Sequence, residues 1–224
     1  MRQSQEKRVR IRKLTSVLFV VALCLPTAVF AAQGNAVARM QAFLSRVHSL
    51  KADFTQVVLD ANLQTIKQSS GTLILKRPNR FRWDYAAPNR EIIDADGTRV
   101  WMYDVELQQV TVKPLTGTLA ASPAVLLAGS NDVQQNFIVK NLGEENGLEW
   151  VGVTPKIRDT DFDSVKLGFR GNLVAVMELK DALGNLTRIT FSHVQVNPAL
   201  PDSLFKFTPP SGADVIGDAG KPGS

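Results

Sequence analysis

The stretch Lys76-Arg77-Pro78-Asn79-Arg80-Phe81-Arg82-Trp83-Asp84-Tyr85 gives the clearest indication of how this chain folds. From Arg80 to Tyr85, charged residues alternate strictly with aromatic ones. Successive side chains of a β-strand point to opposite faces, so the aromatic residues share one face and the charged residues share the other. The stretch therefore predicts a strand with one aromatic face, entered through a turn at Pro78-Asn79.

Other strand-like stretches precede and follow this strand in the sequence, separated by turn residues such as Pro88-Asn89 and Asp96-Gly97. An amphipathic helix is predicted over 36–49, and the pattern Ser122-Pro123 to Gly129 predicts a short apolar helix. A helical turn is expected at 201–205, with a last edge pairing at Phe207. Strands are predicted at 52–60, 66–76, 80–85, 90–94, 99–103, 108–113, 137–142, 148–154, 164–170, 173–180 and 186–196.

The order of these elements sets the fold class. Consecutive hairpins favour a meander, and a sheet of this many strands tends to curl. Its apolar face needs a cover, and the short helices are the available material. We therefore predict a mainly β fold in which a single antiparallel sheet of about eleven strands curls into an incomplete barrel, covered by a lid of short α-helices.

The N-terminus has the features of a cleaved secretory signal peptide. Six Lys or Arg residues precede an uncharged apolar run from Leu14 to Leu25, and Val29-Phe30-Ala31 offers small residues for cleavage after Ala31. The apolar run is shorter than the roughly 20 residues of a membrane span, which disfavours an uncleaved anchor. Leu23 before Cys24 disfavours a lipoprotein signal. Residues 32–224 are then one domain, with a tail that we expect to be mobile from about 211.

The net charge of +5 belongs to the leader, which holds six of the 26 Lys and Arg and one of the 21 Asp and Glu. The exported part is left with 20 of each, so it has no basic field to attract nucleic acid. It also has no cysteine, because Cys24 lies in the leader.

Catalysis has little support in the sequence. The chain has two histidines, His48 and His193, and it lacks the Gly-x-Ser-x-Gly and His-Glu-x-x-His patterns. The acidic run from Asp159 to Asp163 fails as a calcium loop, because Ser164 and Arg170 occupy positions that require Gly and Glu. We expect no enzyme activity, no metal and no cofactor.

The pattern KRPN-x-F-x-W at Lys76–Trp83 resembles the signature of the LolA family of outer-membrane lipoprotein carriers. The leader, the apolar helix after Ser122-Pro123 and the ending Phe205-Lys206-Phe207-Thr208-Pro209-Pro210 strengthen the resemblance. It implies an apolar cavity for acyl chains between sheet and lid, and a lid held shut by Arg77 through backbone carbonyls of the helices. The implied cavity lining is Phe81, Trp83, Tyr85, Trp101, Tyr103, Leu126 and Leu127.

The resemblance also implies a function and partners. The protein would be a monomeric periplasmic carrier that takes acylated lipoproteins from an inner-membrane ABC transporter and delivers them to an outer-membrane receptor. Two alternatives stay open: a lipid-binding or envelope-sensing module of the same fold, and a periplasmic hydrolase. From the residues alone, an ordinary sheet core is the favoured interpretation of the aromatic set.

Overall fold

The structure is a computed structural model that describes residues 35–86, 89–115, 124–129, 133–156 and 162–217. The predicted signal peptide at 1–31 lies outside these residues, and so do Asp159 and Asp161.

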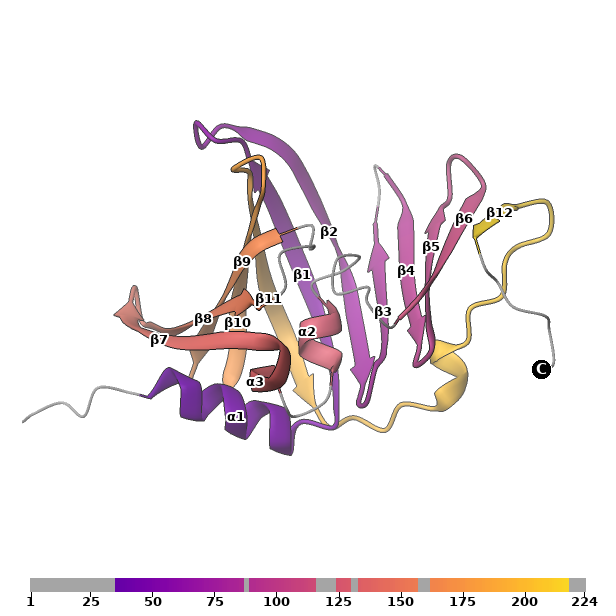
Figure 1. Ribbon diagram of the computed structural model, residues 1–224. Coiled ribbons are helices and arrows are strands. Elements are labelled where there is room, and N and C mark those ends of the chain that lie inside the picture. The colour runs from indigo at the N-terminus through magenta and orange to yellow at the C-terminus, as the bar shows by residue number, and fades with distance from the viewer. Residues whose placement is uncertain (1–34, 87–88, 116–123, 130–132, 157–161, 218–224) are drawn as a thin grey trace, which may run out of the picture. The chain divides into compact units, whose positions relative to one another are not determined.

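One sheet contains all the described strands, in the order β12-β6-β5-β4-β3-β2-β1-β11-β10-β9-β8-β7 (Figure 1). β1 to β6 follow one another as hairpins, β7 to β11 do the same, and β1 pairs with β11 where the two runs meet. β12 and β7 are its two edges, so the sheet is not closed into a barrel. The strands are β1 Ser49–Leu59, β2 Thr65–Lys76, β3 Arg80–Tyr85, β4 Glu91–Asp96, β5 Arg99–Asp104, β6 Gln109–Pro114, β7 Phe137–Glu145, β8 Leu148–Pro155, β9 Phe162–Arg170, β10 Leu173–Asp181, β11 Leu186–Val196 and β12 Asp214–Gly217.

The predicted mainly β class with one open sheet is confirmed, and eleven of the strands lie where the sequence placed them, within a few residues. The twelfth, β12, was missed. It pairs with β6 in parallel, from Asp214 opposite Gln109 to Gly217 opposite Val112, so the sheet is not wholly antiparallel.

Three helices pack on one face of the sheet (Figure 1). α1 (Ala36–Arg46) contacts β7, β8 and β9, α2 (Ala124–Ala128) contacts β2 and β3, and α3 (Val133–Asn136) contacts β7. Buried side chains of all three helices join those of the sheet in one apolar core. We call this side of the sheet the inner face, and the opposite side the outer face. α3 was not predicted, since a single helical turn is too short to show a period.

The sequence predicts the start of α1 correctly and its end incorrectly. The Asn35 side chain accepts a hydrogen bond from the amide of Ala38 at 3.2 Å, which caps the first turn. The prediction that the helix continues to Ser49 was wrong. Val47 is already extended, and Ser49 pairs with Lys76 as the first residue of β1. The apolar stripe of the helix continues past Arg46 in the sequence, but pairing with β2 ends the helix before these residues.

The C-terminal segment returns along the outer face. The predicted helical turn is present as η1 (Asp202–Phe205), with Phe205 buried. Phe207 does not make an edge pairing; its ring lies 5.7 Å from that of Trp101 and 6.0 Å from that of Tyr103. Within the tail that was expected to be mobile from about 211, Asp214–Gly217 form β12. A Cβ at Gly217, where φ is +108°, would come within 2.2 Å of the Val112 carbonyl oxygen, so this position of β12 requires glycine.

Candidate functional site

Phe81, Trp83 and Tyr85 lie together on the inner face, as their alternation predicted. Phe81 and Trp83 are fully buried, and Tyr85 is partly exposed. The Trp83 ring lies 6.3 Å from the Tyr85 ring, which donates a hydrogen bond from its hydroxyl to Gln56 at 3.0 Å. Burial raises the pKa of Tyr85, and the neighbouring charge of Glu91 raises it further.

Two more rings complete this group, and the sequence analysis missed both. Phe54 of β1 lies 4.9 Å from Trp83 and 5.1 Å from Tyr85, and Phe191 of β11 lies 6.3 Å from Trp83. We call Phe54, Phe81, Trp83, Tyr85 and Phe191 the inner aromatic cluster. Phe54 and Phe191 stand directly opposite each other in the β1–β11 pairing, a long-range contact that no local pattern reveals.

Trp101 and Tyr103 do not join the inner aromatic cluster, although the sequence analysis placed them there. They form a separate cluster with Val110 and Val112, against which Phe207 packs. The pairing decides this: Arg82 opposes Asp94, and Asp94 opposes Trp101, so Trp101 lies on the outer face with the charged side of β3. β5 is apolar on both sides, and its own alternation therefore cannot tell which side faces the helices.

The outer face also buries a charged pair beneath the C-terminal segment. Asp94 is fully buried, and the Arg82 guanidinium lies 3.5 Å from its carboxylate. Neither carboxylate oxygen has a hydrogen-bond partner among the described residues. Burial raises the pKa of Asp94 to about 7, and nearby Asp96 adds to the effect against the opposing influence of Arg82.

Arg77 connects the ends of two helices. Its Nε donates to the carbonyl of Val47, the C-cap of α1, at 2.7 Å, and its Nη1 donates to the carbonyl of Gly129, just past α2, at 2.9 Å. Helix C-termini carry partial negative charge and exposed carbonyls, so a cation with several donors fits both. The hydrogen bonds that the resemblance implied are therefore present, and we call this arrangement the Arg77 clamp.

The backbone of the β2–β3 turn reinforces the Arg77 clamp. The backbone amide of Arg77 donates to the carbonyl of His48, and the backbone amide of Asn79 donates to the carbonyl of Ala128, each at 2.8 Å. Asn79 has φ of +62°, a conformation that asparagine tolerates better than most residues. Burial lowers the pKa of Arg77 to about 10, so the guanidinium remains charged at neutral pH. Its Nη2 is buried without a hydrogen-bond partner among the described residues.

The two main helices are held differently. α1 has its own polar tie to the sheet, since Arg39 forms an ion pair with Glu149 of β8 and donates to the Gly171 carbonyl at 3.2 Å. α2 contributes Leu126 and Leu127 to the core, and both are buried. At the C-terminal end of α2, Gly129 and Ala128 accept hydrogen bonds from Arg77 and Asn79.

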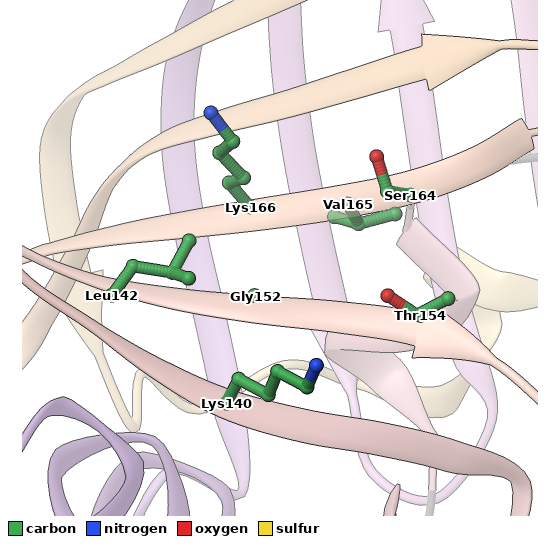
Figure 2. Close-up of a pocket in the computed structure, with 7 residues that line it drawn as sticks. All are labelled: Lys140, Leu142, Gly152, Thr154, Ser164, Val165 and Lys166. Atoms are coloured by element: carbon green, nitrogen blue, oxygen red, sulfur yellow. The ribbon is translucent and has the colours of Figure 1, made fainter.

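A small pocket of about 180 Å³ lies over β7, β8 and β9 and is shown in Figure 2. Gly152 and Thr154 line it and alternate along β8 with the core residues Val151 and Val153, which places the pocket on the outer face. Val165 of the core also lines it. It is smaller than typical ligand pockets of roughly 300–1,000 Å³. It is not the predicted acyl-chain cavity, which stays a prediction.

The two histidines have different surroundings. His193 contacts Asp53 at 2.8 Å on the outside of the β1–β11 pairing, and His48 is exposed after α1. Within the described ranges, no three His, Cys, Asp or Glu side chains gather as a metal site requires. The helices of these ranges also include none long and apolar enough to span a bilayer.

Comparison with known proteins identifies the family. The sequence profile described as "Outer membrane lipoprotein carrier protein LolA" matches residues 45–208. The chain is 44% identical over 197 residues to an "Outer-membrane lipoprotein carrier protein" from Dechloromonas aromatica, which covers 88% of this chain and 95% of the relative. A relative of the same description from Cupriavidus pinatubonensis is 43% identical over 205 residues, 88% of this chain and 97% of its own.

Among solved structures, a LolA superfamily protein from Nitrosomonas europaea aligns with a TM-score of 0.46 and 12% identity, over 75% of this chain and 97% of that one. The profile match spans most of the chain, and two relatives exceed 40% identity over nearly their full lengths. The chain therefore belongs to the LolA family of outer membrane lipoprotein carrier proteins.

Proposed function

We propose that this protein carries lipoproteins across the periplasm by sheltering their acyl chains between the inner face of the sheet and the helices. The observation that supports this best is the Arg77 clamp, which closes two helix ends over a fully buried aromatic surface. A buried methylene contributes about 0.8 kcal/mol, so several acyl chains provide tens of kcal/mol of apolar driving force. A carrier has to shield such chains and still release them.

The clamp suits a carrier because it opposes loading by a limited amount. In the closed state the two carbonyls at Val47 and Gly129 are satisfied by one side chain. Opening exposes them and the guanidinium, which costs on the order of a few kcal/mol for hydrogen bonds to a charged group. Net affinity for cargo falls by the same amount, and this favours onward transfer.

The helix that moves is α2. α1 is held to β8 by the ion pair between Arg39 and Glu149, which does not involve Arg77, whereas the described hydrogen bonds at the end of α2 come from the β2–β3 turn. Release of Arg77 and Asn79 from Gly129 and Ala128 frees the C-terminal end of α2 from β3. The acyl chains then enter over Leu126 and Leu127.

Family membership supports a location and a set of partners for this carrier. Residues 1–31 direct export and are cleaved, and the mature carrier works in the periplasm. An ATP-driven transporter in the inner membrane loads it, and a receptor in the outer membrane unloads it. The protein itself hydrolyses nothing, because cargo passes between binding sites down a gradient of affinity.

The test is a transfer assay with spheroplasts, purified carrier and outer-membrane vesicles. Wild-type protein is expected to release acylated lipoproteins as one-to-one complexes and pass them to the vesicles. Arg77→Leu should form the complexes and retain them. Arg170→Leu removes an exposed arginine at the end of β9 and is the matched control.

Equal transfer by Arg77→Leu and Arg170→Leu would remove the clamp from the mechanism. Absence of lipoprotein release, together with a free lipid in the mass spectrum of the purified protein, would instead support a lipid-binding module of the same fold.

A further inference from the structure

Trp83 carries a buried donor with no hydrogen-bond partner among the described residues. The other two indoles are satisfied: Trp101 donates to Asp96 at 3.0 Å, and Trp150 donates to the Glu145 carbonyl at 3.3 Å. Trp83 is nevertheless the most buried of the three, with no exposed surface. A buried polar group normally has a partner, so a bare indole N–H inside a core calls for an explanation.

The surroundings of Trp83 offer no substitute acceptor. Its nearest rings are Phe54 at 4.9 Å, and Tyr85 and Phe191 at 6.3 Å each. The Tyr85 hydroxyl already donates to Gln56. On either side, β3 pairs with Leu73 of β2 and Ile93 of β4, so neighbouring backbone carbonyls serve the sheet.

The position of Trp83 fits a ligand that enters from the rim of the inner aromatic cluster. Tyr85, two residues further along β3, is partly exposed, and its ring lies 6.3 Å from that of Trp83. The indole therefore lies one side-chain step inside the accessible end of the cluster. A polar group near the head of an acyl chain reaches this depth when the chain itself fills the space beyond.

We propose that the Trp83 Nε1–H donates a hydrogen bond to an ester or amide carbonyl of the bound acyl chains. This inference rests on the proposed carrier function. A carbonyl is the acceptor that an otherwise apolar acyl group brings, and it carries no charge into the core. A free fatty acid would bring a carboxylate, whose burial is unfavourable without a paired cation.

Trp83 is thus a residue that selects neutral acylated cargo over free fatty acids and plain hydrocarbon. The apolar rings around it bind any chain of the right volume and cannot distinguish these ligands. An unpaired donor does distinguish them, because it stays unsatisfied beside hydrocarbon and becomes satisfied beside a carbonyl.

The experiment compares two lipids that differ only in their carbonyls: dilauroylglycerol, with ester-linked chains, and didodecylglycerol, with ether-linked chains of equal length. Binding of both is measured to the purified protein, and the indole N–H signals are followed by ¹⁵N NMR. Trp101→Phe and Trp150→Phe assign the three signals, since these indoles lie outside the inner aromatic cluster.

The expected result is a downfield shift of the Trp83 signal with the ester lipid alone, and roughly five- to tenfold tighter binding of the ester, the size of one neutral hydrogen bond. Trp83→Phe should abolish the ester preference. The ratio of the two affinities within one variant cancels the effect of a smaller ring on packing.

Equal affinities for ester and ether, with an unmoved Trp83 signal, would overturn the inference and leave the carrier function standing. Binding of neither lipid would also overturn the inference, and the transfer assay with spheroplasts would decide the carrier function separately.

Discussion

The guanidinium carbon of Arg77 lies 5.6 Å from the centre of the Phe43 ring, so the residue that joins the two helix ends also stacks on the buried face of α1. Phe43 in turn contacts Phe169 of β9 edge-on, with the ring centres 6.0 Å apart. The Arg77 clamp is therefore continuous with the apolar core, and its effect on stability is measurable.

Arg77→Lys is expected to lower the free energy of unfolding by about 1–3 kcal/mol. Lysine keeps the charge, but its single nitrogen cannot reproduce the fork that reaches Val47 and Gly129 together. Urea unfolding measures the change. Arg170→Lys, at an exposed position at the end of β9, should shift stability by less than about 0.5 kcal/mol. Equal shifts for the two variants would show that the clamp contributes nothing to the closed state.

Asp94 makes stability depend on pH in a definite direction. Its pKa is raised to about 7 in the folded protein from an ordinary value of 3.8, so the folded state binds the proton more tightly than the unfolded state. Its contribution is therefore fully present below pH 3.8 and is lost as pH rises towards 7.

Asp94→Asn removes this dependence. The free energy of unfolding of the variant minus that of wild type should rise between pH 4 and 8, with a slope of at most about 1.4 kcal/mol per pH unit. Urea titrations at several pH values give the slope, and Asp163→Asn at an exposed position of β9 is the control. A flat difference would mean that Asp94 does not hold its proton in the folded state.

The outer-face cluster should matter for stability and not for lipid binding. The ring centres of Tyr103 and Phe207 lie 6.0 Å apart. A double-mutant cycle of their alanine variants should give a coupling free energy of about 0.5–1.5 kcal/mol in stability. Phe207→Ala should leave the affinity for an acyl lipid within about twofold of wild type, whereas Phe54→Ala on the inner face should weaken it. If both variants weakened lipid affinity to a similar extent, the inner face would not be the specific lipid-binding surface.

Gly71 is the tightest point between β2 and β3. A Cβ there would lie 1.9 Å from the Asp84 carbonyl oxygen and 3.0 Å from the Phe54 ring. Gly71→Ala should therefore cost at least about 3 kcal/mol, since backbone and a buried ring must both shift. Thermal unfolding measures the loss.

The matched control for Gly71 is Gly168→Ala in β9, whose added Cβ meets only the Trp150 side chain, at 3.1 Å. A side chain gives way more easily than a paired strand, so this loss should be smaller. A Gly71→Ala variant as stable as Gly168→Ala would contradict the close approach of β2 and β3.

The sequence by itself determined the features that depend on neighbouring residues. Alternation at Arg80–Tyr85 fixed a strand and the face shared by Phe81, Trp83 and Tyr85, because side-chain direction along a strand is a local property. Hairpins at turns such as Asp96-Gly97 follow for the same reason, since the Asp96 carboxylate accepts from the amides of Thr98 and Arg99.

Tertiary structure alone decided the features that depend on pairing between distant segments. The pairing of Arg82 with Asp94 and of Asp94 with Trp101 places Trp101 on the outer face. Residues 214–217 form β12 because they pair with the edge of β6. Ser49 lies in β1 and not in the helix because it pairs with Lys76 of β2. The same packing gives the Trp83 indole no acceptor among the described residues, because which groups meet in a core depends on long-range contacts that the local pattern does not contain.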